Sequence, residues 1–233
     1  MKHNSIIEGG LLDSVVGIET AQIDYTRAQT SVVKRAMDIV MSVVLLVFIA
    51  PLLLVIAIAI KLEDGGPILF AHKRRGLRGE TFRCFKFRSM VKDAESQLNA
   101  LLESDPVAAE EWRLYKKVKN DPRITKVGKL LRKSSLDELP QILNILMGDM
   151  SIVGPRPITD KEVPDYGVSS DFDVYCSVRP GVLGLWQVSG RSDTDFERRV
   201  QLDTKYARTW NVWLDLEIMF RAVPVVLLGK GAY

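Results

Sequence analysis

The sequence predicts an α+β protein, mostly helical, in which a re-entrant membrane helix is joined to a compact cytosolic domain. Residues 39–60 form an almost entirely apolar run, in which only Ser42 and Pro51 fall outside the apolar set. The whole 233-residue chain is 47% hydrophobic and 26% charged, so the remainder has the mixed composition of a soluble domain. Two short runs read as strands, whereas several longer segments read as helices.

Three regions follow from this pattern. Residues 1–31 are predicted to be a mobile polar tail, because they contain Gly9-Gly10 and lack sustained apolar periodicity. Residues 32–61 are assigned to the membrane helix. Residues 62–233 are assigned to the cytosolic domain, including C-terminal helices that lie at the membrane surface.

The apolar run is long enough to cross a membrane. Its 22 residues would extend roughly 33 Å as a helix, about the thickness of the hydrocarbon core. Pro51 removes a backbone hydrogen bond near the middle, which predicts a helix–break–helix at Ala50-Pro51. Basic residues flank the run on both sides: Lys34 and Arg35 before it, and Lys61, Lys73, Arg74, Arg75 and Arg78 after it. Because positive flanks favour the cytoplasm, we expect a helix that enters and leaves by the same face, with a straight spanning helix as the alternative.

The expected cytosolic elements begin with a hairpin. Residues 68–71 and 81–88 read as strands around a glycine-containing turn. The helices expected next are residues 92–118 with a break at Asp105-Pro106, a short basic helix over residues 126–133, and residues 139–147 ending at Gly148.

The C-terminal part begins with a loop-rich region over residues 154–195 and continues as an amphipathic helix over residues 196–209. Residues 210–228 are rich in apolar side chains, but their charged residues argue against a second membrane span. Trp210 and Trp213 suit the lipid headgroup level, and a core helix is the alternative.

Charge is distributed unevenly and excludes several classes. Residues 1–60 carry a net charge of −1, residues 61–133 of +8 and residues 134–233 of −4. Two cysteines, Cys84 and Cys176, are too few for a disulfide scaffold or a thiolate zinc site. The aromatic and basic residues of 82–88 resemble a nucleic-acid binder. The membrane segment and the acidic C-terminal part argue against it, so we predict no nucleic-acid partner and assign the basic face to anionic headgroups of the lipid bilayer.

The densest chemical signal surrounds Asp137 and Glu138. Pro140 fits only the first turn of a helix, which puts the helix start near Asp137. Simple capping, with Ser135 and Glu138 as a capping box, is one interpretation. The other is a site for phosphate chemistry, in which surrounding arginines keep Asp137 ionised as a nucleophile toward phosphorus or as a ligand of Mg²⁺. The arginines that could converge there are Arg88, Arg123, Arg132 and Arg156.

Other candidate residues are less specific. Arg156 lies between two prolines that fix its backbone, which favours an aimed guanidinium over a merely stiff surface turn. Arg179, Gln187 and Arg191 lie in glycine-rich sequence that could close on a nucleotide or phosphate, and surface positions explain them equally well. The two histidines, His3 and His72, are expected to be incidental, and both cysteines to be packing residues.

An ordered set of motifs resembles a known family, the bacterial sugar transferases, which are monotopic polyprenyl-phosphate phosphoglycosyl transferases. The resemblance extends from about Val33 to Tyr233. Its motifs are Lys34-Arg35-Ala36-Met37-Asp38, Lys86-Phe87-Arg88-Ser89-Met90, Asn120-Asp121-Pro122-Arg123, Ser135 through Gln141, Gly148-Asp149-Met150-Ser151, Gly154-Pro155-Arg156-Pro157, and Arg179-Pro180-Gly181 through Gly190-Arg191.

The resemblance implies an exopolysaccharide-initiating enzyme on the cytoplasmic face of the bacterial inner membrane. Such an enzyme transfers hexose-1-phosphate, from UDP-galactose or UDP-glucose, to polyprenyl (undecaprenyl) phosphate and releases UMP. Asp137 would be the nucleophile, and Glu138 would help hold Mg²⁺ beside it. The residues expected to bind substrate are Lys86, Arg88, Arg123, Arg132, Arg156, Arg179, Gln187 and Arg191.

Two positions depart from the family pattern. Ala50 precedes Pro51 where the family commonly has Ser, and Leu183 stands where it often has Thr. Two rival functions stay open: direct transfer in a ternary complex with Asp137 only as a metal ligand, and a non-catalytic membrane scaffold for polysaccharide assembly. A homo-oligomer is compatible with the sequence, and neither the hexose nor the polyprenol is specified by it.

Overall fold

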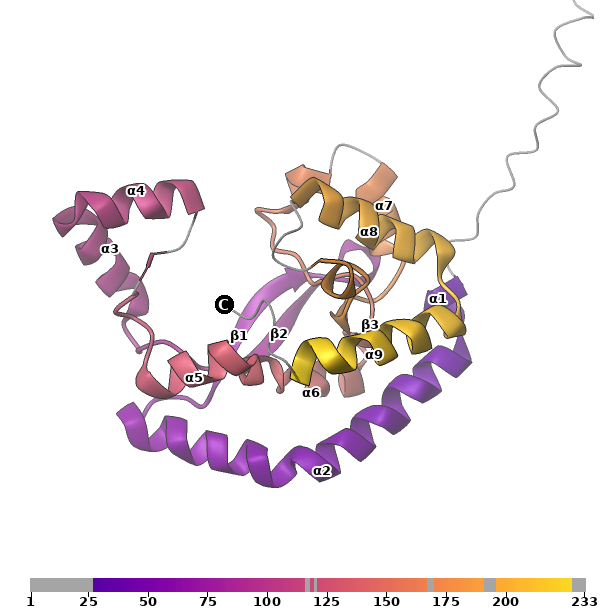
Figure 1. Ribbon diagram of the computed structural model, residues 1–233, viewed down its shortest axis with the longest axis horizontal. Helices are drawn as coiled ribbons and strands as arrows, with labels where there is room; N and C mark the ends of the chain where they lie inside the picture. The colour runs from indigo at the N-terminus through magenta and orange to yellow at the C-terminus, as the bar shows by residue number, and fades with distance from the viewer. Residues whose placement is uncertain (1–26, 116–117, 120, 167–169, 191–195, 228–233) are drawn as a thin grey trace, which may run out of the picture.

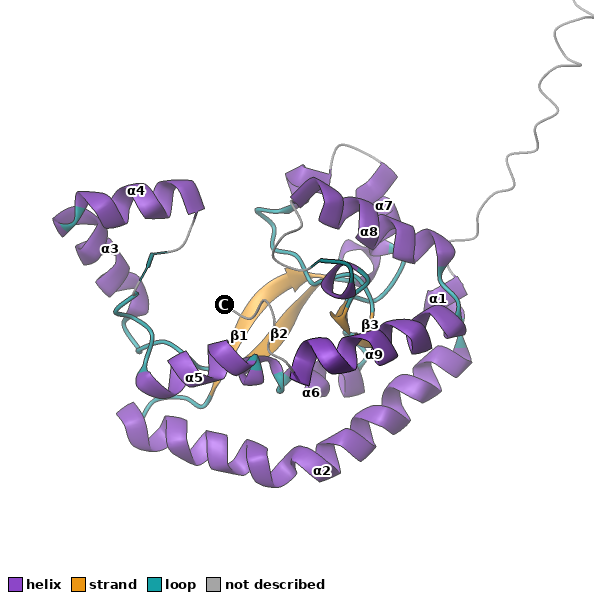
Figure 2. Cartoon of the chain, in the orientation of Figure 1, coloured by secondary structure: helices purple, strands orange, loops and turns teal. Residues whose placement is uncertain are grey.

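Over the residues that the structure describes, the protein is mostly helical with two small sheets, so the α+β class is confirmed (Figures 1 and 2). The computed structural model describes residues 27–115, 118–119, 121–166, 170–190 and 196–227. Residues 1–26 of the expected tail lie outside the described residues. At the end of the expected tail, Arg27–Thr30 form helix α1, and the small Ala28 side chain is buried in a core with Val153 and Tyr206.

The membrane helix is α2, Val32–Asp64, and it continues unbroken through Pro51. It bows in its middle part, away from the rest of the protein (Figure 1). The expected break is therefore a bend, since one missing amide leaves the neighbouring helical bonds in place. Within the part of the chain that the structure describes, α2 is the one helix long and apolar enough to cross a membrane, and only 11% of its apolar window is buried. Entry and exit by one face stay a prediction.

Buried polar contacts fix the first turns of α2. Lys34 Nζ lies 2.7 Å from Asp215 Oδ2 and donates to the Val153 carbonyl at 3.0 Å. Tyr206 donates to the other Asp215 oxygen at 2.7 Å, and Trp210 Nε1 donates to Asp215 Oδ2 at 3.0 Å. These contacts join α2 to β3 (Ser151–Val153), α8 (Phe196–Thr209) and α9 (Val212–Leu227).

The charged residues in the first turns of α2 form contacts with the rest of the protein. Asp38 accepts from Ser151 Oγ at 2.9 Å and from the Ile152 amide at 3.0 Å. Arg35 donates to the carbonyls of Ile145 and Leu146 on α6 (Gln141–Met147). Lys34 is buried and paired with Asp215, so it does not contribute to the positive charge that was expected to hold this flank at the cytoplasmic surface.

The far end of α2 is also held. Gly65 ends the helix in the left-handed conformation, with φ of 69°. Glu63 accepts from the Lys126 amide at 2.7 Å, at the start of α5 (Lys126–Ser134), where a helix favours negative charge. Both ends of the bowed helix are therefore tied to the rest of the protein.

The predicted hairpin and the helices after it are confirmed. Strands β1 (Leu69–Arg75) and β2 (Thr81–Phe87) pair antiparallel, with β1 longer than expected, and the short helix η1 (Leu77–Gly79) forms the turn. Helices α3 (Ala94–Ser104) and α4 (Pro106–Tyr115) break at Asp105 and project away from the body (Figure 1).

The loop-rich expectation for residues 154–195 was wrong in part. Strand β4 (Gly181–Leu183) pairs parallel with β3, and α7 (Ser170–Cys176), η3 (Val163–Tyr166) and η4 (Trp186–Val188) lie in this region. Such short strands carry no periodic signal. Gly154 and Gly181 touch across the pair, where a Cβ on Gly181 would lie 2.1 Å from the Gly154 amide. These glycines serve close backbone contact rather than loop flexibility.

Helix α8 is confirmed. Helix α9 has one buried face, as expected of a core helix, and one exposed apolar face, as expected of a helix at the membrane surface. Asp215, Ile218 and Ala222 are buried, as in a core helix. Trp213 and Phe220 are largely exposed on the same helix, as an interfacial helix requires.

Asp215→Ala is predicted to lower the free energy of unfolding by about 3–5 kcal/mol, because it leaves the Lys34 ammonium buried without its partner. Denaturant unfolding in detergent micelles measures the loss. The matched control is Glu217→Ala on the same helix, whose exposed pair with Arg221 should contribute less than about 0.5 kcal/mol. Equal losses in the two variants would contradict a structural role for the buried pair.

Candidate functional site

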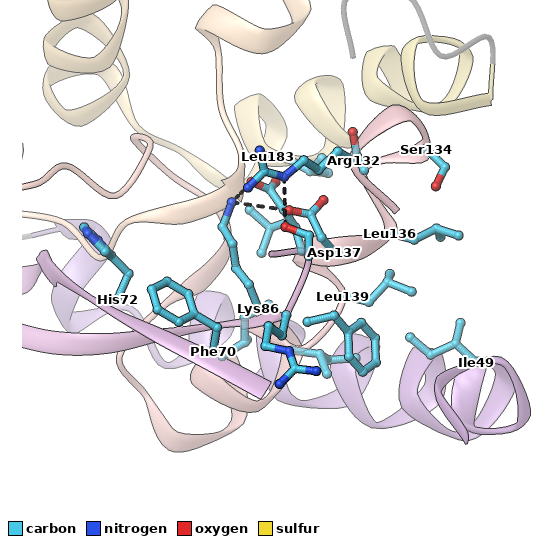
Figure 3. Close-up of a pocket in the computed structure, with 18 of the residues that line it drawn as sticks. Ile49, Phe70, His72, Lys86, Arg132, Ser134, Leu136, Asp137, Leu139 and Leu183 are labelled. Carbon is cyan, nitrogen blue, oxygen red and sulfur yellow. Dashed lines mark hydrogen bonds and ion pairs between the residues drawn. The ribbon is translucent and has the colours of Figure 1, made fainter. Parts of the chain in front are cut away.

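A cavity of about 1990 Å³ lies between α2, the hairpin, α5 and α6. One end is lined by charged groups that include Lys86, Asp137 and Glu138. The other end is apolar and is lined by α2 residues such as Phe48 and Ile49. Figure 3 shows the two ends, with Leu136 and Leu139 between them.

The carboxylate pair is presented by a turn rather than by the first turn of a long helix. Ser135 adopts the left-handed conformation after α5, with φ of 56°, and Leu136–Glu138 form the short helix η2. The Ser135 amide donates to the Arg132 carbonyl, and the Glu138 carboxylate accepts from Lys86, so the reciprocal bonds of a capping box are replaced. The left-handed residue redirects the chain, and α6 begins only at Gln141.

Cations from two other segments meet the pair. Lys86 on β2 points toward η2 (Figure 3), and its Nζ lies 2.7 Å from Glu138 Oε1 and 3.8 Å from Asp137 Oδ2. Arg156 Nη1 lies 3.8 Å from Glu138 Oε1. Arg156 was among the arginines expected to converge on the pair, and it lies beside Glu138. Lys86 was expected only to bind substrate, and its contact with the pair was not foreseen.

The two adjacent carboxyls differ in acidity. Burial raises the pKa of Asp137 and the charge of Glu138 adds to this, while Lys86 and Arg132 oppose it without prevailing. Our expectation that the positive field dominates at Asp137 was therefore wrong. Burial alone would also raise the pKa of Glu138, but Arg156 and Lys86 outweigh it and lower the pKa. Neighbouring acids separated in this way are typical of sites where the two groups have different roles.

Three further predicted arginines reach the cavity wall. Arg132 Nε donates to Ser89 Oγ at 2.8 Å. Arg88 is buried and paired with Asp64. Arg123 is also buried and forms a two-pronged pair with Asp121, with contacts of 2.6 and 2.8 Å. Arg88 and Arg123 thus already have anionic partners from the chain, whereas Arg132 retains donors for a ligand.

The remaining predicted residues are placed differently. Gln187 lies at the cavity wall, and its side-chain oxygen accepts from the Gly184 amide. Arg179 lies away from the cavity and donates to the Gly148 carbonyl at 2.8 Å. Arg191 lies outside the described residues. Leu183 lines the cavity, and Ala50 and Pro51 are exposed on α2.

Comparisons with known proteins identify the family. The model of the family described as bacterial sugar transferase matches residues 29–229. The chain belongs to the bacterial sugar transferase family. The exopolysaccharide production protein ExoY of Sinorhizobium fredii is 45% identical over 86% of this chain and 88% of its own length.

Two further relatives are longer than this transferase. The undecaprenyl-phosphate galactose phosphotransferase of Salmonella typhimurium is 46% identical over 91% of this chain and 44% of its own length. The UDP-glucose:undecaprenyl-phosphate glucose-1-phosphate transferase of Escherichia coli is 40% identical over 86% of this chain and 41% of its own. The chain therefore spans less than half the length of these two relatives.

Several wall residues of the transferase were missed by sequence reasoning. Ser89, Phe70 and Trp186 line the cavity, and so does His72, which had been expected to be incidental. The glycine at position 128, inside a predicted helix, was the sequence signal for a close contact here, because a Cβ there would lie 2.1 Å from the Ser89 carbonyl oxygen. The glycine lets α5 approach the segment after β2, and this contact brings Arg132 to Ser89.

The carboxylates of the transferase suit one kind of metal site. Among the described residues, no group of three or more His, Cys, Asp and Glu side chains could hold a metal ion. Mg²⁺ in phosphate chemistry commonly takes only one or two carboxylates and completes its shell with water and substrate oxygens. Asp137 and Glu138, adjacent at one end of the cavity, match that donor set.

A buried acid lies behind Arg156. Asp203 accepts from the Tyr166 hydroxyl at 3.0 Å, and Arg199 Nε lies 3.7 Å from it. Burial raises the pKa of Asp203 from 3.8 to about 7, with Arg199 and Tyr166 opposing. Folding therefore favours the protonated acid, and this contribution to stability is lost as the pH rises from 3.8 through 7.

Asp203→Asn is predicted to remove this pH dependence, because the amide keeps an acceptor but does not titrate. The melting temperature of the variant, relative to that of wild type, should be higher at pH 8 than at pH 5. These two pH values lie about one to two units on either side of the transition. Thermal unfolding at both pH values measures it. A difference that is the same at both would show that Asp203 is ionised throughout.

Proposed function

We propose that this transferase moves hexose-1-phosphate from a UDP-hexose to polyprenyl phosphate and releases UMP, through a covalent intermediate on Asp137. The observation that carries the proposal is the carboxylate pair held by Lys86 and Arg156 at the charged end of a cavity whose other end is apolar. The names of these two relatives, which specify undecaprenyl phosphate with galactose or glucose, support it.

The proposed reaction has two steps on one phosphorus atom. A carboxylate oxygen of Asp137 attacks the phosphorus that bears the hexose, the bond to the bridging oxygen breaks, and UMP leaves with that oxygen. An oxygen of the polyprenyl phosphate then attacks the same phosphorus and the Asp137 carboxylate leaves. One phosphoanhydride is exchanged for another, so positioning and charge stabilisation are the main tasks of the protein.

The surrounding side chains suit these tasks. An anionic nucleophile must approach an anionic diphosphate, and Lys86, Arg132 and Arg156 supply the positive charge that offsets the repulsion. Glu138, with its lowered pKa, stays ionised. We assign Mg²⁺ to Asp137 and Glu138, where the bound ion would neutralise charge on the diphosphate.

The apolar end of the cavity suits the acceptor. Residues Val40, Val44, Leu45, Phe48 and Ile49 of α2 line it, so a prenyl chain there would contact the membrane helix. The phosphate of such a lipid would lie at the headgroup level, close to the carboxylate pair. The cavity would thereby admit the nucleotide sugar from water and the acceptor from the bilayer.

We place the cytosolic domain on the cytoplasmic face of the inner membrane. The exposed side of α5 carries Leu130 among Lys126, Lys129 and Lys133, which suits anionic headgroups. The exposed Trp213 and Phe220 of α9 suit the same interface. A re-entrant α2 would return the chain to that face.

Incubation of the protein with Mg²⁺ and a UDP-hexose alone is predicted to produce a phosphohexose adduct, detected by intact mass spectrometry. Asp137→Asn should abolish it, since the amide is a far weaker nucleophile. Asp160→Asn is the matched control, because Asp160 is an exposed carboxylate paired with Arg75. An adduct that persists in Asp137→Asn would place the nucleophile on another residue.

The rival functions give different results in the same preparation. Exchange of labelled UMP into UDP-hexose without an acceptor requires the covalent route, so its absence beside normal turnover would favour direct transfer in a ternary complex. Failure to release UMP with any combination of hexose donor and polyprenyl phosphate would favour the scaffold. Turnover against a panel of UDP-sugars identifies the hexose.

Topology is tested with cysteines at Val32 and Leu62, near the two ends of α2, both 80% exposed. Since the native Cys84 and Cys176 are buried, an impermeant thiol reagent should report the new positions. We predict that Val32→Cys and Leu62→Cys both label from the cytoplasmic side. Labelling from opposite sides would establish a straight spanning helix.

A further inference from the structure

We propose that Trp186 is a positioning residue that holds the Arg156 guanidinium toward Glu138 and the donor diphosphate. The inference rests on the proposed function, because it assigns a role at the same site. Trp186 opens the short helix η4 and lines the cavity. It lies within the Arg179–Arg191 motif, but the sequence analysis assigned it no chemical role.

Two guanidinium groups lie over the Trp186 ring. The Cζ atom of Arg156 lies 5.9 Å from the ring centroid, and that of Arg199 lies 5.6 Å from it. An indole face attracts cations at these distances, and more strongly where water is excluded. Arg156 thus has two contacts that define its direction: the indole and, 3.8 Å away, the Glu138 carboxylate.

The indole is itself held in place. A Cβ on Gly184 would lie 3.0 Å from Trp186 Cδ1, so the backbone of Gly184 packs directly against the edge of the ring. The ring also packs against the hydrophobic core that contains Tyr206 and Ile218. Trp186 is therefore a fixed surface rather than a side chain that adapts to Arg156.

Arg199 contacts the Trp186 ring from the protein interior. Its side chain is 12% exposed, against 32% for that of Arg156. It pairs with Glu162 at 3.4 Å and with Asp203 at 3.7 Å. Of the two arginines on the indole, Arg199 is tied to the half-buried Glu162 and the buried Asp203, and Arg156 keeps access to the cavity.

The backbone of Arg156 is constrained independently. Prolines precede and follow it, and the Tyr175 hydroxyl lies 3.2 Å from its carbonyl oxygen. What stays variable is the long side chain, whose rotamer freedom would have to be lost each time it binds phosphate. By restricting those rotamers before substrate arrives, Trp186 would raise the fraction of molecules with a correctly aimed guanidinium.

The test compares Trp186→Leu, Trp186→Phe and wild type in the full chain, with radiolabelled UDP-hexose and polyprenyl phosphate. Trp186→Leu is expected to lower kcat about 10-fold with a smaller change in KM, because misdirected charge acts mainly on the transition state. Trp186→Phe should recover most of the loss, since it keeps an aromatic face. Arg208→Ala on α8, an exposed arginine paired with Asp171, is the control and should match wild type.

A double-mutant cycle with Arg156→Ala decides whether the effect passes through that arginine. In the Arg156→Ala background, Trp186→Leu should cause no further loss, because there is no guanidinium left to position. Losses that multiply, or a Trp186→Leu variant with normal kcat, would overturn the proposal. If Trp186→Leu does not fold, Gly184→Ala replaces it in the cycle and should lower kcat by displacing the ring.

The failure of this inference is distinct from the failure of the proposed function. A folded wild-type protein that forms no product and no adduct with any UDP-hexose would overturn the proposed function and the role of Trp186 with it. An active wild type whose Trp186 and Arg156 effects are independent would overturn only the positioning role.

Discussion

The buried ion pair between Lys34 and Asp215 is the contact on which the other features of this transferase depend. Two charges are removed from water, which is unfavourable unless each finds partners, and here Tyr206, Trp210 and the Val153 carbonyl complete the set. The pair fixes the start of the membrane helix against α8, α9 and β3. Glu63 holds the other end of α2 to α5, and the middle of the helix bows away from the rest of the protein. The apolar side chains of α2 line one end of the cavity.

The apolar side chains of α2 and the carboxylate pair line opposite ends of one cavity. At the charged end, burial and nearby cations act on two adjacent acids in opposite directions, raising the pKa of Asp137 and lowering that of Glu138. At the other end, side chains of the membrane helix provide an apolar lining. The architecture thus brings a charged end and an apolar end of one cavity together without any large sheet among the described residues.

Local sequence signals predicted the hairpin, the break at Asp105 and the α8 helix, because each depends on neighbours along the chain. They failed where the backbone is set by distant contacts. Strands β3 and β4 are three residues each and exist only because Gly154 and Gly181 allow two segments to touch. The left-handed Ser135, which presents Asp137 and Glu138 on a turn, is a rare conformation that residue type did not predict.

The sequence by itself determined that one segment is apolar enough for a membrane. It predicted a break at Pro51, where the helix continues, and it predicted Asp137 and Glu138 as the chemical focus, which stays a prediction. Only the tertiary structure decided which charges are available to a ligand. Lys34, Arg88 and Arg123 are each paired with a carboxylate outside the Asp137–Glu138 pair, on Asp215, Asp64 and Asp121. Among the other cations that line the cavity, Lys86 and Arg156 meet Glu138, and Arg132 donates to Ser89. The physical reason is that the partner of a charge is set by the packing of distant segments: Lys34 and Asp215 are 181 positions apart.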